Sequence, residues 1–269
     1  MNKYLKNGCK GVLGTALFLS TVAQAAIINQ PVSVTVRDFH QIHPDFQYAV
    51  SGVTTGMVGN TLVGGKPVFI GAPGYGAVNN AQTFSTWFSN CNAATPGVTC
   101  VNQYNVNINA TVDTSTGKLT YNNSSFFPLD PITGITNDGD QFNEHNYFFT
   151  AQFGLNLIYD PKLINTFSFT GDDDVWVFIN DTLVLDLGGV HAAATKGFNM
   201  NTVASQLGIQ AGQQYKFDFF FAERHYSQST VNFESYLGAP VDVPEPSSLA
   251  LLSLSILGLA GAARRRRRA

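Results

Sequence analysis

The sequence predicts an all-β protein, mainly an antiparallel β-sandwich with one or two short helices. Apolar residues alternate with polar residues in many short segments, and no regular helical pattern separates these segments. Gly, Asn, Ser and Thr are plentiful, and only 12% of the 269 residues are charged. This composition is more typical of secreted β-proteins than of helical cytosolic proteins.

Alternation locates most of the strands. Outside the central stretch described next, we expect strands in six segments: residues 32–36, 106–112, 119–121, 147–159, 215–221 and 231–236. Three aromatic residues with helical spacing predict a short helix within 81–90, and a second helix is expected within 197–208. The Gly-rich segment 51–80 is expected to form loops.

The stretch 167–191 has the strongest pattern in the chain. An entering strand with two phenylalanines is interrupted by three aspartates, Asp172, Asp173 and Asp174. Apolar residues then occupy both faces of 175–179, which predicts a strand that is buried on both sides. Asn180 and Asp181 form a two-residue turn signal, so the following alternating leucines predict a hairpin.

Three adjacent carboxylates in such a strand pair need an explanation, because like charges repel and burying an unpaired ion costs roughly several kcal/mol. Calcium is one explanation, since it takes its ligands from carboxylate, amide and carbonyl oxygens. A solvated acidic turn held by Asx hydrogen bonds is the other. The residue pattern leaves both explanations open.

GDDDVWVFIN followed by LVLDLGGVH resembles the fibro-slime domain, an extracellular module related to the protective-antigen-type β-sandwich lectin domain. The resemblance covers most of the chain. Further motifs follow in the family's order: VRDF at 36–39, HPDF at 43–46, GKPVF at 65–69, FFPLD at 126–130, HNYFFT at 145–150 and FAERH at 221–225. The resemblance implies a β-sandwich that acts outside the cell.

The resemblance also implies a calcium site. In the related lectins, two adjacent aspartates of this loop hold a calcium ion that contacts sugar hydroxyls, and they correspond here to Asp172 and Asp173. Asp174 stands where those lectins usually have glycine, a departure that affects sugar binding more than calcium binding. Asp174 or Asn180 is expected to supply a further oxygen, and Trp176 is expected in the core.

The charge of the chain excludes one class of partner. The formal net charge is −3, but eight of the 15 basic residues lie in terminal segments that are expected to be removed. Seven basic residues then remain against 18 acidic residues, a net charge of about −11. Binding to nucleic acid needs a basic surface, so no nucleic-acid partner is expected.

Residues 1–25 are expected to be a secretory signal peptide. Three lysines precede an apolar run, and an A-x-A sequence predicts cleavage between Ala25 and Ala26. An uncleaved anchor is the alternative, although the apolar run is short for a membrane span. Residues 26–31 are expected to form a short linker, and residues 32–238 a single sandwich domain.

Residues 239–269 resemble a PEP-CTERM sorting signal: the motif Val243-Pro244-Glu245-Pro246, an apolar stretch and five arginines. The apolar stretch would insert transiently in the inner membrane as a helix, with the arginines on the cytoplasmic side. The resemblance implies processing by an exosortase and export, through the inner membrane and periplasm, to the surface of a Gram-negative bacterium. A permanent anchor is the alternative.

Cys91 and Cys100 are expected to form a disulfide, because export places the chain in an oxidising compartment and eight residues separate the two cysteines. A metal site built on two cysteines is the alternative. It lacks nearby ligands of the usual spacing.

The chain is not expected to be an enzyme, because hydrolase motifs such as G-x-S-x-G and H-E-x-x-H are absent. His145, His191 and His225 could form a metal site with Glu223, or be hydrogen-bonded structural residues. The leading hypothesis is a non-catalytic, calcium-dependent module that binds extracellular polysaccharide or matrix. A structural matrix protein is the second hypothesis, and a polysaccharide-processing enzyme the third.

Overall fold

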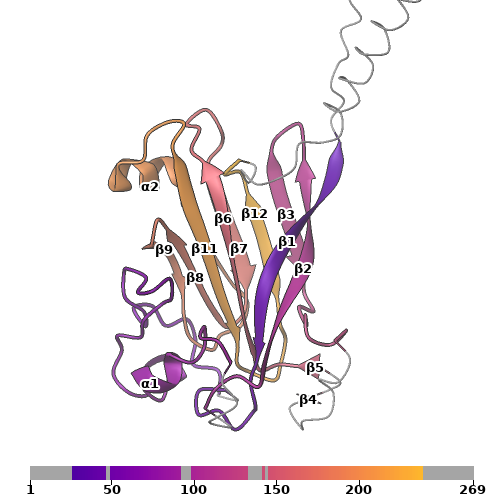
Figure 1. Ribbon diagram of the computed structural model, residues 1–269, viewed down its shortest axis with the longest axis vertical. Coiled ribbons are helices and arrows are strands. Elements are labelled where there is room, and N and C mark those ends of the chain that lie inside the picture. Colours follow the sequence, from indigo (N-terminus) through magenta and orange to yellow (C-terminus); the bar gives the residue numbers. More distant parts are fainter. Residues whose placement is uncertain (1–25, 47–48, 92–97, 133–140, 143–144, 239–269) are drawn as a thin grey trace, which may run out of the picture.

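A computed structural model describes residues 26–46, 49–91, 98–132, 141–142 and 145–238. Ten antiparallel strands form one hydrogen-bonded sheet in the order β10-β7-β12-β3-β2-β1-β6-β11-β8-β9 (Figure 1). The strands are β1 (Ile27–Asp38), β2 (Asn102–Asp113), β3 (Lys118–Asn123), β6 (Phe149–Ile158), β7 (Thr166–Gly171), β8 (Asp174–Ile179), β9 (Thr182–Leu187), β10 (Ala194–Asn199), β11 (Gln214–Glu223) and β12 (Val231–Ser235). Two further short strands, β4 (Gln141–Phe142) and β5 (His145–Asn146), pair with each other.

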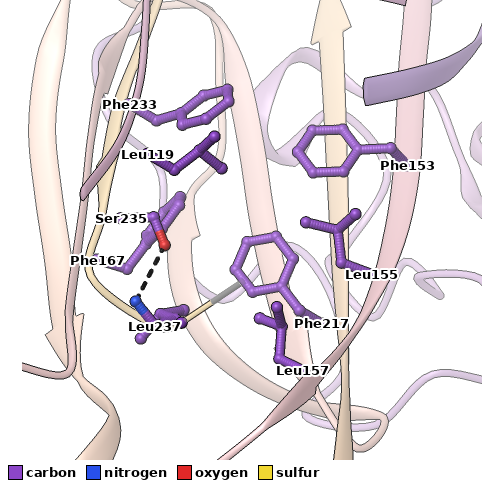
Figure 2. A pocket seen from close by; sticks show the side chains of 10 residues that line it. Leu119, Phe153, Leu155, Leu157, Phe167, Phe217, Phe233, Ser235 and Leu237 are labelled. Carbon is purple, nitrogen blue, oxygen red and sulfur yellow. Dashed lines mark hydrogen bonds between the residues drawn. The ribbon is translucent and has the colours of Figure 1, made fainter. Parts of the chain in front are cut away.

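The sheet bends into two layers that face each other across a shared core. Phe167 on β7 lies 5.2 Å from Phe217 on β11 between ring centroids, although these strands are not hydrogen-bonded neighbours. Phe153 on β6 and Phe233 on β12 make a similar contact at 6.2 Å. Figure 2 shows these four rings facing one another around a small apolar cavity of about 20 Å³. The predicted antiparallel β-sandwich is therefore confirmed.

The two edges of the bent sheet come together again at β9 and β10. The Lys196 ammonium on β10 donates to the Asp186 carbonyl on β9 at 3.0 Å. This contact brings the two edge strands close to each other without pairing their backbones in a ladder.

A second apolar core lies on the outer face of β8 and β11. The described residues between Phe39 and Cys100, here called the covering segment, fold over this face. The covering segment carries the short helix α1 (Ala81–Phe84) and the 3₁₀ turn η1 (Tyr75–Ala77) and lies at the lower end of Figure 1. Trp176 on β8 contacts Phe84 and Trp87 of this segment. All six residues of β8 are buried, so the predicted strand with two buried faces is confirmed and Trp176 is a core residue.

Helix α2 (Met200–Leu207) lies at the opposite end of the sandwich in Figure 1, within the expected segment 197–208. The expected helix within 81–90 is shorter than predicted, because it ends at Phe84 and turns follow. The sequence did not reveal β10, an edge strand whose six residues are all partly or fully exposed. Ala194 and Phe198 pack partly against the core, but Lys196 stands between them, so the strand shows no run of apolar alternation.

One prediction about the chain's organisation is wrong. Residues 26–31 are not a linker, because β1 begins at Ile27, which pairs with Asp113 of β2. The strand that precedes the three aspartates is β7, which pairs with β10 and β12 in the opposite layer, so the aspartates lie where the chain crosses between layers.

The expected signal peptide 1–25 and the sorting segment 239–269 lie outside the described residues. Ala26, at the start of the described chain, exchanges two hydrogen bonds with Thr114, both of 3.0 Å. Over the described ranges, no helix combines the length and the apolar character that a membrane crossing requires.

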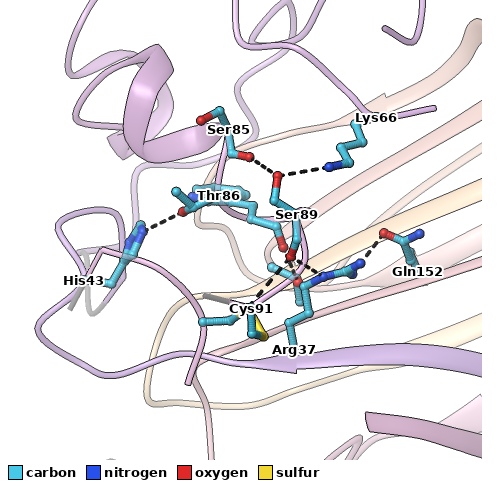
Figure 3. The surroundings of a disulfide bond; sticks show 11 residues. Arg37, His43, Lys66, Ser85, Thr86, Ser89, Cys91 and Gln152 are labelled. Atoms are coloured by element: carbon cyan, nitrogen blue, oxygen red, sulfur yellow. Dashed lines mark hydrogen bonds between the residues drawn. A yellow bond between two sulfur atoms is a disulfide. The ribbon is translucent and has the colours of Figure 1, made fainter. Parts of the chain in front are cut away.

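Cys91 and Cys100 form the predicted disulfide, which lies where the covering segment joins the sheet (Figure 3). Close to it, the Arg37 guanidinium of β1 donates to the Ser89 carbonyl at 2.8 Å and to Gln152 of β6 at 3.0 Å. Lys66 donates to the Ser89 hydroxyl at 3.0 Å. The disulfide and the Lys66 bond are internal to the covering segment, and the Arg37 guanidinium fastens that segment to β1 and β6.

Reduction of this disulfide is expected to lower the free energy of unfolding by about 2–3 kcal/mol, because the open chain regains loop entropy when it unfolds. Urea unfolding of the purified protein with and without reductant measures this loss. The variant Cys91→Ser/Cys100→Ser should be equally destabilised and insensitive to reductant. Equal stability of the oxidised and reduced proteins would contradict the prediction.

Candidate functional site

The three aspartates occupy the crossing from β7 to β8 and are withdrawn from solvent. Asp172 and Asp173 are each 3% exposed, and Asp174 is fully buried. Asp173 has a φ of 54°, the left-handed conformation that non-glycine residues rarely adopt. The chain can therefore reverse direction here and turn all three carboxylates inward. A solvated acidic turn is thus excluded, and each carboxylate needs a partner inside the protein.

Arg224 supplies the principal partner. Its Nε atom lies 2.6 Å from Oδ2 of Asp174, and both side chains are completely buried. The other oxygen of Asp174 accepts a hydrogen bond from the Gly189 backbone at 2.6 Å. A buried ion pair is stable only with such full bonding, because both charges have lost their water. The carboxylate of Asp174 is therefore engaged by protein groups on both oxygens.

The rest of the Arg224 guanidinium binds the covering segment. It donates to the backbone carbonyls of Gly76 at 2.9 Å, Ala77 at 3.0 Å and Asp45 at 3.1 Å, and it lies over the Trp87 ring at 4.8 Å. The Asp45 carboxylate accepts from the Trp87 indole at 2.9 Å. One arginine thus joins β8, β11 and the covering segment.

Asp173 and Glu223 form a pair of two acidic side chains that interact with each other. Oδ2 of Asp173 accepts from the Arg224 backbone at 2.7 Å. Burial raises the pKa of Asp173 to about 7, with Asp174 adding to the rise and Arg224 opposing it. Burial, together with the charges of Asp173 and Asp172, raises the pKa of Glu223 well above its usual value. Near neutral pH this pair retains a proton that an exposed pair would lose.

Asp172, Asp173, Asp174 and Glu223 together form a buried acidic cluster. Two carboxylate oxygens of this cluster have no hydrogen-bond partner. They are Oδ2 of Asp172 and Oε2 of Glu223, and both are buried. The other oxygen of Asp172 accepts from the Thr230 backbone, and burial raises the pKa of Asp172. Buried oxygens without a partner are unusual in folded proteins. These two are the oxygens of the acidic cluster that remain available for a proton or a cation.

The three histidines have separate partners. Nδ1 of His145 lies 2.6 Å from the Asp130 carboxylate, and its ring stacks on Phe127. Both ring nitrogens of His191 face backbone carbonyls, and the backbone of His225 donates to Glu223. In the part of the chain that the structure describes, no three side chains of His, Cys, Asp or Glu are grouped to hold one metal ion. These contacts favour structural roles for the histidines.

The prediction that Asn180 contributes an oxygen to the acidic loop is wrong. Asn180 begins the turn at the other end of β8, and a six-residue strand spans roughly 20 Å. Its side-chain oxygen accepts from the Lys216 backbone at 2.8 Å. Asn180 and Asp181 both have positive φ, as a tight hairpin turn requires, so the turn prediction is confirmed while the ligand role is excluded.

The sequence did not indicate Arg224 as the central residue of this site. A signal for it was present, because Arg37 and Arg224 are the two arginines within residues 26–238. Arg224 follows an apolar strand that the alternation already predicts to be buried. A cation at the end of a buried strand requires a buried anion, but the sequence does not say which of several carboxylates it meets.

Comparison with known proteins identifies two parts of the chain. Residues 116–245 match the PA14 domain, and residues 242–268 match the PEP-CTERM protein-sorting motif. The PA14 match covers 130 of the 269 residues, a little less than half of the chain. The acidic cluster and the two sheet layers described above lie mostly within this matched region. The recognition of a protective-antigen-type domain and of a sorting signal from sequence is therefore confirmed.

The chain is also similar to proteins of Dictyostelium discoideum. It is 35% identical to protein psiD over 215 residues, which cover 75% of this chain and 40% of psiD. It is 40% identical to protein psiI over 139 residues, 49% of this chain and 18% of psiI. The chain thus spans less than half the length of these relatives, so the similarity concerns one region of each.

Solved PA14 domains are only distantly similar in structure. The "PA14 sugar-binding domain from RTX adhesin" is 12% identical, with a TM-score of 0.30, over 78% of this chain and 93% of that chain. The PA14 domain of the MpAFP antifreeze protein is 16% identical, with a TM-score of 0.27, over 48% of this chain and 68% of that chain.

Replacing Arg224 by methionine is expected to lower the free energy of unfolding by about 3–5 kcal/mol, because Asp174 would remain buried without its counter-charge. Adding Asp174→Asn to this variant should recover part of the loss, since the amide carries no charge to bury. Urea unfolding of wild type, both single variants and the double variant measures the coupling. Purely additive losses would contradict an ion pair that stabilises through its charges.

The raised pKa of Asp173 has a pH signature. A carboxylate whose folded pKa lies above its unfolded value binds more protons in the folded state, so stability falls as pH rises from about 4 to about 7. Asp173→Asn removes this group, so the variant should be more stable than wild type by a few kcal/mol at pH 8. The gain should disappear at pH 4. Thermal unfolding in chelator across this pH range measures it.

The pH dependence of wild-type stability also contains a contribution from His43. The effect of Asp173 is therefore taken from the difference in stability between wild type and Asp173→Asn at each pH. Burial lowers the pKa of His43 to about 4, so His43 contributes stability above its unfolded pKa of about 6.5 that is lost as pH falls toward 4. This slope opposes that of Asp173 in the same window. Because His43 is present in both proteins, its contribution cancels in the difference between wild type and Asp173→Asn, which reports Asp173 together with its interacting partner Glu223. A difference that does not change with pH would contradict the raised pKa.

Proposed function

We propose that the exported chain is a non-catalytic module that binds extracellular polysaccharide at the cell surface or in the matrix, with calcium held at the acidic cluster. The observation that carries this proposal is the pair of buried carboxylate oxygens without partners, Oδ2 of Asp172 and Oε2 of Glu223. Hard cations such as calcium take carboxylate oxygens as ligands. The Arg224 guanidinium pairs with Asp174. A calcium ion would supply the positive charge that the other carboxylates of the cluster lack.

The proposed calcium ligands are Asp172 and Asp173, with Glu223 as a third carboxylate. Asp174 is bonded to Arg224 and Gly189, and Asn180 lies at the far end of β8, so neither belongs to the set. The three carboxyls are not grouped around one point. Calcium binding must therefore displace the retained proton and turn these side chains toward the ion. Calcium affinity should accordingly increase with pH.

The same geometry supports a binding role rather than catalysis. A glycosidase needs two carboxyls that flank the bond it cleaves, with room for the sugar between them. Asp173 and Glu223 interact directly with each other and are buried beneath the chain. An acid pair without access for a sugar is suited to holding an ion or a proton.

The two family matches support the polysaccharide partner and the location. A PA14 domain followed by a PEP-CTERM protein-sorting motif is consistent with an extracellular, surface role. We propose for this chain cleavage of the signal peptide before Ala26, transient insertion of the C-terminal apolar stretch in the inner membrane, exosortase processing near Pro244-Glu245-Pro246, and a final place at the surface of a Gram-negative bacterium.

A second candidate function is a structural matrix protein without a glycan ligand. It is favoured by Arg224, which neutralises Asp174 completely and so explains part of the acidic loop without any ion. The two candidates differ in one respect. A glycan module loses its ligand when calcium is removed, whereas a structural protein binds no glycan in either state.

Calcium is expected to raise the midpoint of thermal unfolding. An ion at about 100 times its dissociation constant adds about 2.7 kcal/mol, which for a chain of this size is roughly 5–10 °C. The variant Asp172→Asn/Glu223→Gln should show no rise. Asp160→Asn is the matched control, because Asp160 makes an ordinary turn hydrogen bond with the Lys162 backbone. It should respond as wild type does.

Two results would overturn the calcium assignment. One is an unchanged midpoint in wild type together with no calcium in metal analysis of the purified protein. The other is an equal rise in wild type and in Asp172→Asn/Glu223→Gln, which would place the ion elsewhere. Glycan binding that persists in chelator would separate the polysaccharide function from calcium.

A further inference from the structure

A groove lies where β2 and β3 part. The two strands pair only between Thr111–Asp113 and Lys118–Thr120. Beyond this point β3 pairs with β12 alone and β2 with β1 alone, so within the described residues the facing edges are unpaired. The opening has a volume of about 420 Å³. This is within the range of small-molecule sites, roughly 300–1,000 Å³.

The lining combines aromatic rings with side-chain amides. The principal residues are Asn107, Asn109, Tyr121, Asn123, Phe126 and Phe127. Asn107 and Asn109 are exposed on β2, whereas Tyr121 and Phe127 are half-buried on the opposite wall. The Asn123 amide donates to the Tyr121 hydroxyl at 3.2 Å, which fixes both groups. Tyr121 stacks on Phe233 and Phe127 on His145, so each of these two rings has one face occupied within the protein. The groove therefore offers partly exposed aromatic rings beside hydrogen-bonding groups that donate and accept.

This chemistry matches a neutral sugar chain. A pyranose ring presents C–H groups on its faces, which pack on aromatic rings, and hydroxyls at its edges, which bond to amides. The described residues that line the groove include no charged side chain. An acidic sugar would lose the hydration of its carboxylate here without gaining a cation. A peptide with charged side chains would meet the same cost.

The groove is connected to the acidic cluster through two neighbouring residues. Phe126 in its wall donates through its backbone to the Ser229 carbonyl and accepts from the Ser229 hydroxyl, both at 2.8 Å. Ser229 also contacts Glu223, and the backbone of Thr230 donates to Asp172. These contacts link the acidic cluster to a residue that lines the groove, and none of the described lining residues is a carboxylate.

We propose that this groove between β2 and β3 is the glycan site, and that it binds a neutral oligosaccharide segment of the extracellular polysaccharide. This inference rests on the glycan-binding function proposed above and places the sugar away from the acidic loop. The acidic cluster then supports the groove through Ser229 and Thr230 without contacting the sugar.

The test measures binding of neutral glucose and mannose tetrasaccharides, and of a uronic-acid tetrasaccharide, to the purified exported chain by calorimetry. Asn107→Ala/Asn109→Ala removes the exposed amides, and Phe127→Leu removes a ring while keeping an apolar side chain. Each should weaken binding of a neutral tetrasaccharide at least tenfold. Asn29→Ala/Asn156→Ala is the matched control, since both are exposed strand asparagines outside the groove, and it should bind as wild type does.

The calcium-induced rise in the unfolding midpoint is recorded for every variant. The proposal is supported if the groove variants lose the sugar and keep the calcium response. If both groove variants bind as wild type does while Asp172→Asn/Glu223→Gln does not, the sugar lies at the acidic loop; the groove is then rejected and the glycan function stands. Tighter binding of the uronic-acid probe rejects the neutral ligand. Absence of any binding to wild type rejects the glycan function itself.

Discussion

The ion pair between Arg224 and Asp174 is the interaction on which the rest of the structure depends. Both side chains are entirely buried, at the point where the inter-layer core and the outer core meet. Desolvating two charges costs more than their attraction returns unless every remaining donor and acceptor is bonded. The carbonyls of Asp45, Gly76 and Ala77 satisfy the guanidinium, and these groups belong to the covering segment. The buried guanidinium is therefore fully bonded only when the covering segment occupies this position.

The same arginine explains why the acidic cluster is chemically unbalanced. One cation stands against Asp172, Asp173, Asp174 and Glu223, and its guanidinium is bonded to Asp174 alone among them. The remaining carboxyls respond by retaining protons, which is the physical meaning of the raised pKa of Asp173 and Glu223. The calcium ion proposed above would have to displace these protons, so its binding is expected to depend on pH. Its stability and its ion binding are therefore linked to pH.

The two-layer arrangement also creates the groove. For the sheet to bend, β3 must leave β2 after three residue pairs and continue beside β12. Parting strands leave backbone edges and a space that side chains do not fill. The loop that follows β3 lines this space with Phe126 and Phe127, and hydrogen bonds to Ser229 hold it in place. The proposed sugar site and the acidic cluster are therefore both products of chain crossings rather than of regular strand surface.

Local patterns in the sequence determined a large part of this protein. Alternation placed the main strands, two apolar faces identified β8 as a doubly buried strand, and Asn180-Asp181 marked its hairpin turn. The acidic triplet was recognised as the unusual feature of the chain, and Cys91 and Cys100 as a disulfide. Each of these properties depends on residues that are close in sequence, where spacing and side-chain type carry the physical information.

Only the tertiary structure decided how these parts are partnered. In the structure β7 lies in the layer opposite β8, and Asp174 pairs with an arginine 50 residues away. Asn180 lies outside the site, and β2 and β3 separate after three residue pairs. The edge strand β10 also escaped prediction, since its two core-facing apolar residues, Ala194 and Phe198, are separated by a lysine on the same face. The common reason is that strand pairing and charge pairing are choices among distant segments. Sequence spacing does not rank those choices, because the free energy of each depends on the burial that the whole fold creates.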